Sequence, residues 1–256
     1  VSENRMFDFD GEIAAAWHLL FGIARSKQRS EQAIEAQPDF RSLSVEIGGR
    51  YLTQSGNSIT LVQRHIEGDY LNTIFDPANS TNDGFRQYES ELQANWGLNA
   101  KSTVTGRLAR LERHNDNFSQ RDFSGLAGSI TYLWTPAAKM RTDFSARRDI
   151  SPWQDVIATY RVDNTLLIEP IWEVSAKIML RARLERVQSY FRGGAVLPAN
   201  GQTRRDSGNN ALISVKWLPL RILTVDVGLE LQQRSSNDAL ARYDASTATL
   251  GASLTF

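Results

Sequence analysis

Charged side chains recur at even spacings in two parts of the sequence, which places them together on one face of a β-strand. The first cluster consists of Lys139, Arg141, Asp143, Arg147, Arg161 and Asp163, and the second of Lys177, Arg181, Arg183, Glu185, Asp226 and Glu230. Arginine and carboxylate groups arranged in this way can hydrogen-bond sugar hydroxyls or the carboxylates of an acidic glycan. They can equally satisfy one another as cross-strand ion pairs that stiffen a wall.

Hydrolytic chemistry has little support in the sequence. A hydrolase of the serine type needs a serine and a histidine within hydrogen-bond reach, and the chain has only three histidines. The one local grouping with suitable residue types is His114–Ser119, and such groupings are common in polar loops. Cysteine is absent, and no metal-ligand spacing, P-loop or dinucleotide-binding glycine motif occurs. We therefore expect no enzyme activity, no catalytic residue, no metal and no cofactor.

The elements that must carry these charges are β-strands, because apolar and polar residues alternate along most of the chain. In the clearest stretch, the apolar side consists of Trp172, Val174, Ala176, Ile178, Leu180, Ala182 and Leu184. The same pattern predicts thirteen strands, near residues 5–17, 21–30, 40–54, 58–70, 85–97, 102–114, 123–135, 138–148, 156–168, 171–191, 209–218, 221–234 and 242–256.

A membrane is expected to cover the apolar side of each strand. Mean hydropathy is −0.38, and the absence of any run of 18 or more apolar residues excludes a transmembrane helix. The strands of a transmembrane barrel alternate and therefore average to a polar composition. Lys plus Arg and Asp plus Glu number 29 each, so the net charge gives no support for nucleic-acid binding.

The connections between the predicted strands are of two kinds, short and long, that alternate along the chain. Short ones fall at residues 17–20, 55–57, 96–99, 134–136, 168–170 and 217–219. Long polar ones fall at residues 30–38, 72–84, 115–121, 149–155, 192–208 and 235–239. Short turns on one rim and long loops on the other are typical of outer-membrane barrels.

Aromatic residues gather at the predicted short-turn rim, on the apolar side of the strands. They are expected to form the interfacial girdle of a barrel, and they are Trp17, Trp96, Trp134, Trp172, Trp217 and Phe256. A soluble sandwich would also alternate, but its core does not require tryptophans at a single depth. An aromatic residue that ends an alternating strand also resembles the signal read by the bacterial barrel-assembly machinery, which is an expected partner.

The number of strands bears on how the barrel closes. The first and last predicted strands both run toward the short-turn rim, whereas a closed barrel with both ends on the inner side needs an even number. We expect one barrel domain over residues 1–256, an antiparallel transmembrane β-barrel of the outer-membrane type with about 12–14 strands. Upstream strands or a partner chain would complete a larger barrel of about 18 strands, because an open edge cannot stand in lipid.

Three segments carry a resemblance to a known family: residues 50–70 (RYLTQSGNSITLVQRHIEGDY), 119–134 (SQRDFSGLAGSITYLW) and 143–153 (DFSARRDISPW). They resemble the EpsL-type outer-membrane proteins, which are encoded with bacterial exopolysaccharide and exosortase gene clusters. The resemblance implies export of an extracellular polysaccharide across the outer membrane of a Gram-negative bacterium, through a charged hydrated lumen.

Several partners and alternatives follow from this interpretation. Outer-membrane lipid and lipopolysaccharide would surround the barrel. Because the chain has no nucleotide-binding motif, a periplasmic export partner is expected to connect it to an energy source. A general porin, a structural or adhesin barrel without a substrate, and a barrel lipid hydrolase are the alternative functions.

Overall fold

The computed structural model describes residues 2–28, 39–71, 84–153, 158–194 and 202–255, which form one antiparallel sheet. Its thirteen strands are β1 (Ser2–Ala14), β2 (Trp17–Gln28), β3 (Phe40–Leu52), β4 (Ser58–Tyr70), β5 (Gly84–Asn99), β6 (Ser102–Asn115), β7 (Phe123–Ala137), β8 (Met140–Pro152), β9 (Ala158–Ser175), β10 (Ile178–Gly193), β11 (Arg205–Leu220), β12 (Leu223–Ser236) and β13 (Tyr243–Leu254). Two short 3-10 helices, η1 (Ser119–Arg121) and η2 (Ala239–Ala241), lie in connections. No helix within the described ranges is long and apolar enough to cross a membrane.

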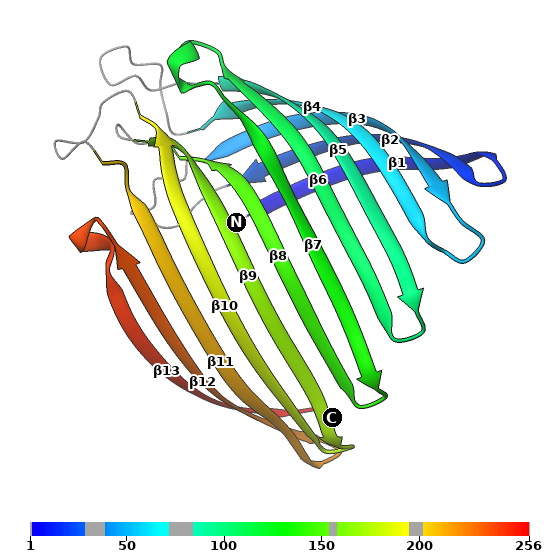
Figure 1. Cartoon of the computed structure of the whole chain (residues 1–256), viewed down its shortest axis with the longest axis vertical. Coiled ribbons are helices and arrows are strands. Elements are labelled where there is room, and N and C mark those ends of the chain that lie inside the picture. The colour runs from blue at the N-terminus through cyan, green and yellow to red at the C-terminus, as the bar shows by residue number, and fades with distance from the viewer. Residues whose placement is uncertain (1, 29–38, 72–83, 154–157, 195–201, 256) are drawn as a thin grey trace.

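The strands follow one another in the sheet in the same order as in the sequence, from β1 to β13. Figure 1 shows that the sheet bends and twists continuously, with β1 and β13 at its two edges. This up-and-down arrangement is the one from which outer-membrane barrels are built. The predicted all-β fold and the predicted number of strands are confirmed.

The two kinds of connection lie at opposite ends of the strands, as predicted. The short-turn rim carries turns at residues 15–16, 53–57, 100–101, 138–139, 176–177 and 221–222. The long-loop rim, at the upper left of Figure 1, carries the connections 29–39, 71–83, 116–122, 153–157, 194–204 and 237–242, parts of which lie outside the described residues.

Five of the six predicted short turns are wrong, because their residues belong to strands. Residues 17–20 lie in β2 and residues 96–99 in β5, and the turns lie at residues 15–16 and 100–101 instead. Proline explains the other three errors. The chain continues as strand through Pro136 in β7, Pro170 in β9 and Pro219 in β11, so the turns come several residues later. Pro136 and Pro219 lie where the strand register is irregular, and at such bulges the missing proline N–H leaves no ladder bond broken. The predicted strand 171–191 is therefore two strands, separated by the turn at residues 176–177.

Each short turn is tied by a hydrogen bond to the next hairpin along the chain. In five of the six turns, a backbone N–H of the following strand or its end donates to the carbonyl of the second turn residue. These donor–acceptor pairs are Leu52–Ala16, Thr135–Lys101, Glu173–Lys139, Leu218–Lys177 and Thr255–Ile222, with distances of 2.8–2.9 Å. In the longer β3–β4 turn, the Asn57 side chain takes this role and accepts from the Gly97 N–H at 2.8 Å.

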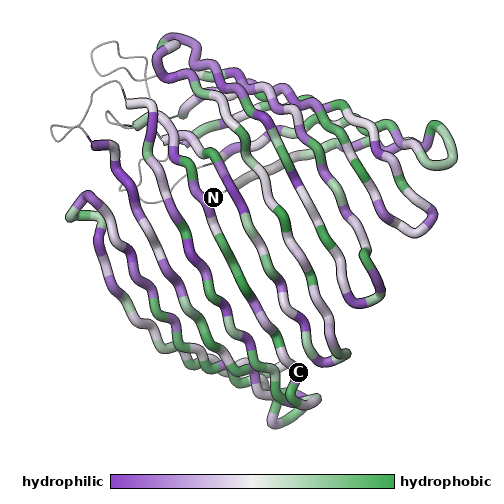
Figure 2. Tube along the Cα trace, viewed as in Figure 1, coloured by the Kyte–Doolittle hydropathy of each residue, from purple (hydrophilic) through white to green (hydrophobic). Residues whose placement is uncertain are grey.

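The two faces of the sheet differ in polarity because successive side chains point to opposite sides. Figure 2 shows hydrophobic and hydrophilic residues alternating along the strands. On the apolar face, large side chains such as Leu61, Leu166 and Ile213 are 54–62% exposed. On the charged face, side chains are more covered, and Glu91 is only 2% exposed. A curved sheet produces this difference when its charged side chains converge on the concave side.

Candidate functional site

The candidate site is the charged face, which carries a ladder of ion pairs across strands β3 to β6. Arg64 of β4 donates from Nε to Glu46 of β3 at 2.8 Å and from Nη1 to Glu89 of β5 at 2.7 Å. Arg107 of β6 donates from Nε to Glu91 of β5 at 2.7 Å. Arg64 also lies 3.8 Å from Glu91. Opposite charges therefore follow one another across four adjacent strands.

Two carboxylates of this ladder, those of Glu89 and Glu91, are largely buried, so their ion pairs contribute to the stability of the sheet as well as to the polarity of the face. The side chain of Glu91 is 3% exposed and that of Glu89 is 11% exposed. A carboxylate removed from water to this extent is unfavourable unless charged partners and hydrogen bonds compensate for the lost hydration. The two arginines supply this compensation, and Gln93 donates a further hydrogen bond to Glu91.

The second predicted cluster is partly brought together on strands β9 and β10. The Nη2 atom of Arg181 donates to both carboxylate oxygens of Glu169, at 2.8 and 2.9 Å. Arg183 donates from Nη2 to Glu185 at 2.5 Å, and its Nε lies 4.0 Å from Glu169. Glu169 lies in a segment predicted to be a turn, so sequence reasoning missed it as the central carboxylate of this group.

The remaining members of the second cluster lie elsewhere. Lys177 occupies a short turn instead of a strand, and its Nζ donates to the Pro219 carbonyl at 3.2 Å. Asp226 and Glu230 are on β12, which β11 separates from β10. Glu230 accepts hydrogen bonds from the amides of Asn210 and Gln232, at 2.9 and 2.8 Å.

The first predicted cluster lies on the neighbouring strands β8 and β9, but its ion pairs run along the strands. Each pair joins residues two positions apart on the same face: Arg141–Asp143 at 3.4 Å, Arg147–Asp149 at 2.7 Å and Arg161–Asp163 at 2.8 Å. Lys139 lies in the turn at residues 138–139 and is exposed, so its predicted place on the strand is wrong.

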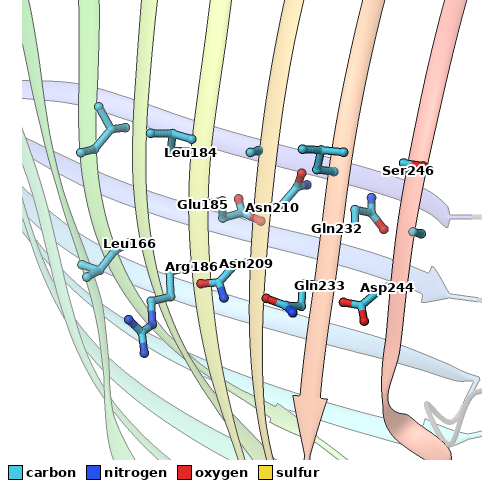
Figure 3. Close-up of a pocket in the computed structure, with 14 residues that line it drawn as sticks. Leu166, Leu184, Glu185, Arg186, Asn209, Asn210, Gln232, Gln233, Asp244 and Ser246 are labelled. Carbon is cyan, nitrogen blue, oxygen red and sulfur yellow. The ribbon is translucent and has the colours of Figure 1, made fainter.

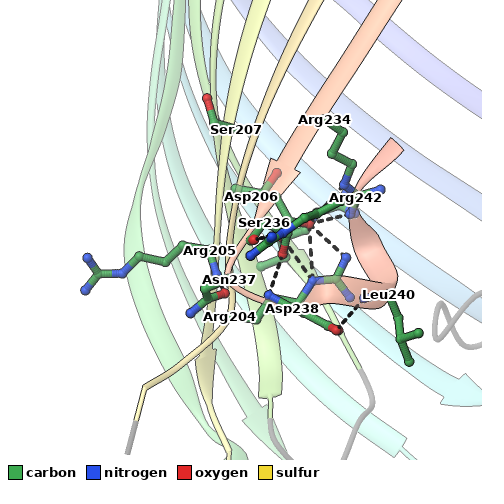
Figure 4. A network of polar contacts seen from close by, with 12 residues as sticks. Arg204, Arg205, Asp206, Ser207, Arg234, Ser236, Asn237, Asp238, Leu240 and Arg242 are labelled. Atoms are coloured by element: carbon green, nitrogen blue, oxygen red, sulfur yellow. Dashed lines mark hydrogen bonds and ion pairs between the residues drawn. The ribbon is translucent and has the colours of Figure 1, made fainter. Parts of the chain in front are cut away.

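A further group near the long-loop rim centres on Asp206, whose side chain is 4% exposed. Arg204 donates to it at 2.8 Å, Ser236 at 2.6 Å, and Arg234 donates to the same carboxylate (Figure 4). Arg242 of the following connection donates to the Ser236 carbonyl at 2.7 Å. The group therefore joins β11, β12 and the connection after η2 at one point of the rim.

Sequence reasoning missed the Asp206 group and the β3–β6 ladder for different reasons. Residues 192–208 were predicted to be a loop, which hid Asp206 near the start of β11. The charges of the β3–β6 ladder do stand at even spacings in the sequence. Which of them face each other depends on strand register, and alternation alone does not determine register.

The structure does not bring the serine and histidine of the predicted grouping together as a hydrogen-bonded pair. The Nδ1 atom of His114 lies 3.0 Å from Oδ2 of Asp122, whereas Ser119, in η1, makes no hydrogen bond to this histidine in the described part of the chain. Within the same residues, no group of three or more histidine, cysteine, aspartate or glutamate side chains could hold a metal ion.

The predicted girdle tryptophans lie on the apolar face near the short-turn rim. Trp17 directly follows the first turn, and each of the others stands four residues before a turn. Their exposed fractions are between 39% and 53%, for Trp17, Trp96, Trp134, Trp172 and Trp217. Phe256, the last predicted member, lies outside the described residues.

Taken together, these features define a class of protein. The chain is a sheet of an outer-membrane β-barrel, with an apolar face for lipid, tryptophans near one rim and a charged opposite face. Barrels built from such sheets span the outer membranes of Gram-negative bacteria, which is the location that the sequence predicts.

Solved structures of outer-membrane barrels share this fold. The ferripyoverdine receptor of Pseudomonas aeruginosa matches all of the chain with a TM-score of 0.61 and 9% identity. The FrpB iron transporter of Neisseria meningitidis matches 97% of it with a TM-score of 0.60 and 11% identity. The siderophore receptor PiuA of Acinetobacter baumannii matches 96% of it with a TM-score of 0.58 and 9% identity.

The match covers only part of each of these larger proteins, because the chain spans 44–49% of their length. At these identities the likeness concerns the fold. No protein-family model matches the sequence, and neither does any curated protein.

Proposed function

We propose that the protein forms part of an outer-membrane conduit that exports an extracellular polysaccharide along its charged face. The observation that carries the proposal is the series of arginine–carboxylate pairs that runs across β3–β6 and β8–β10. A wall of this kind offers a hydrated, nearly neutral surface from one side of the membrane to the other. The resemblance to EpsL-type proteins supports a polysaccharide as the substrate.

The paired charges suit a glycan better than a simple ion. Arginine has five N–H donors, and Arg181 uses only Nη2 for its carboxylate partner, so donors remain for sugar hydroxyls. Carboxylates such as Glu169 can accept from the same hydroxyls. Since the two signs balance along the face, a long uncharged or weakly acidic polymer meets no strong electrostatic barrier. Transport, not catalysis, is the role we propose.

Closure of the conduit requires partners for both sheet edges. β1 and β13 each pair on one side only in the described sheet, and unpaired backbone groups cannot face lipid. We propose that further strands or a partner chain pair with them, that the barrel-assembly machinery inserts the whole, and that a periplasmic partner delivers the polymer.

A general porin is the second candidate, and the mutual satisfaction of the ion pairs favours it. Arg64 has a carboxylate at each side, and the Asp206 carboxylate is fully occupied by its neighbours, so these groups stiffen the wall without any substrate. A passive adhesin barrel would use the same wall.

Single-channel conductance separates these functions. The protein is purified from outer membranes in mild detergent, so that closing strands or partners stay bound, and is placed in planar bilayers. Neutral dextran fragments and acidic polygalacturonate fragments are then added. We expect transient block of the current, weakened by Arg181→Gln on the charged face and unchanged by Arg110→Gln on the other face.

Two results would contradict the export proposal. Conductance that neither glycan blocks indicates a general porin, and absence of any conductance indicates a structural barrel. Deletion of the gene provides the cellular test, because export predicts loss of matrix polysaccharide, whereas a porin or an adhesin leaves the matrix intact.

A further inference from the structure

A hollow of about 720 Å³ lies across strands β9 to β13, and its lining changes from apolar to polar along the strands. Figure 3 shows its residues in rows that cross the strands. The apolar part on the lipid-facing side consists of Leu166, Ile168, Leu184, Ala211 and Leu231. The polar part on the same side consists of Arg186, Asn209 and Gln233, together with Asp244 and Ser246 of the edge strand β13.

Strand register places this change of polarity at one level of the sheet. Leu184, Ala211 and Leu231 face one another across β10, β11 and β12. Arg186, Asn209 and Gln233 form the next row toward the long-loop rim, two residues or about 7 Å further along each strand. The boundary between hydrocarbon and lipid headgroups therefore falls between these two rows.

Positive charge dominates this surface beyond the apolar rows. Among the described residues of β7 to β12, the side chains that point to the lipid side there include four arginines and no carboxylate: Arg148, Arg186, Arg192 and Arg205. Arg186 makes no hydrogen bond or ion pair within the described chain. Arg148 donates only to the Asn164 side chain and the Leu126 carbonyl. The acidic neighbour in this row is Asp244, on the edge strand β13.

The same level of the sheet looks different on the other side. On β3 to β6, the lipid-side arginines each have a carboxylate partner: Arg41–Asp69 at 2.8 Å, Arg86–Asp116 at 3.5 Å and Arg110–Glu112 at 2.8 Å. Arginines without a carboxylate partner therefore gather on β8 to β11, whereas among the described side chains on the other side of the sheet Arg25 of β2 is the one lipid-side arginine of this kind. Within the ranges that the structure describes, Arg186 in particular keeps its donors free for an anion from outside the chain.

We propose that this hollow binds a phosphorylated glycolipid of the outer leaflet, of the lipid A type. Long loops of outer-membrane barrels are extracellular, so the arginines stand at the level of the outer-leaflet headgroups. Their charge is complementary to the lipid phosphates. The apolar rows below accept acyl chains, and the amides of Asn209 and Gln233 can hydrogen-bond the sugar. The proposal requires only that the sheet spans the membrane, and it is independent of what passes along the charged face.

Binding of defined lipids to the detergent-solubilised protein tests the proposal. Native mass spectrometry measures retention of diphosphorylated lipid A, dephosphorylated lipid A and phosphatidylglycerol. We expect preference for the diphosphorylated form and about a tenfold loss of its affinity in Arg186→Gln, because one charge-assisted hydrogen bond is removed. Arg186→Lys should retain most of the affinity, which separates loss of charge from altered folding.

Arg221→Gln is the matched control. Arg221 lies in the turn at residues 221–222, at the opposite rim of the β11–β12 hairpin, and is exposed. The proposal is overturned if Arg221→Gln lowers lipid A affinity as much as Arg186→Gln does. It is equally overturned if dephosphorylated lipid A or phosphatidylglycerol binds as tightly as diphosphorylated lipid A.

Discussion

Adjacent residues of β11 offer a direct test of which side of the sheet faces lipid. Ile213 lies on the apolar face and is 62% exposed, whereas Leu212 lies on the charged face. On the lipid side, Ile213 stands four residues from Trp217 of the girdle and four residues from Asn209 of the first polar row. Replacing each with arginine places the same charge at nearly the same depth, but on opposite faces.

The position of Ile213 gives the expected magnitude. Eight residues at about 3.4 Å each, tilted by about 40°, span roughly 20 Å across the membrane, close to the apolar band of a barrel. Ile213 is midway, where an arginine facing lipid costs about 2–4 kcal/mol. An arginine at Leu212 would stand between Arg183 of β10 and Glu230 of β12, so attraction and repulsion nearly cancel and the change should stay within about 1 kcal/mol.

Equilibrium unfolding by denaturant in lipid vesicles, followed by tryptophan fluorescence, measures both changes. We expect Ile213→Arg to lower the free energy of unfolding by at least about 1 kcal/mol more than Leu212→Arg does. Equal losses, or a larger loss in Leu212→Arg, would refute the assignment of the two faces and with it the conduit.

Two other predictions concern the charged face and the girdle. Glu91→Gln should lower the free energy of unfolding by about 2 kcal/mol, less than a fully buried pair would lose, because its partner Arg107 is 36% exposed. Glu112→Gln, in an exposed pair, should lower it by less than about 0.5 kcal/mol in the same denaturant assay. Similar losses in the two variants would count against a stabilising role of the β3–β6 ladder. In vesicles with lipids brominated near the headgroup, Trp172→Phe should reduce the quenched part of the emission, to which the four other girdle tryptophans still contribute. Trp153→Phe should leave the quenched part unchanged, because Trp153 packs against the buried ring of Phe191, 5.0 Å away. An equal quenched part before and after Trp172→Phe would argue against the place of Trp172 in the girdle.

The architecture could be predicted from the sequence because alternation is a property of each strand alone. Most large apolar residues must stand on the side that avoids water, so a period of two recurs in strands from Phe7 to Leu254. The alternation of short and long connections then identifies the two rims. Strand number, fold class and membrane follow from these two patterns.

The details of the site could not be predicted in the same way, because they depend on how strands align. Glu169 precedes Pro170, and the proline predicts a turn there, whereas in the structure both residues lie within β9. Arg64 has carboxylates on both neighbouring strands, and only the register shows that Glu46 and Glu89 are the ones it meets. The sequence therefore predicts which charged residues share a face of the sheet, but not which of them form ion pairs.

The hydrogen bonds between successive short turns and hairpins have a consequence for how this wall can vary. Because each turn holds the hairpin that comes next, the repeating unit is a pair of strands and not a single one. Removing one whole hairpin would let the preceding turn engage the following one with the same geometry. Removing a single strand would reverse the direction of all the strands that follow it. The carbonyl of the preceding short turn would then have no N–H donor. Relatives of this protein should therefore differ in circumference by two strands at a time.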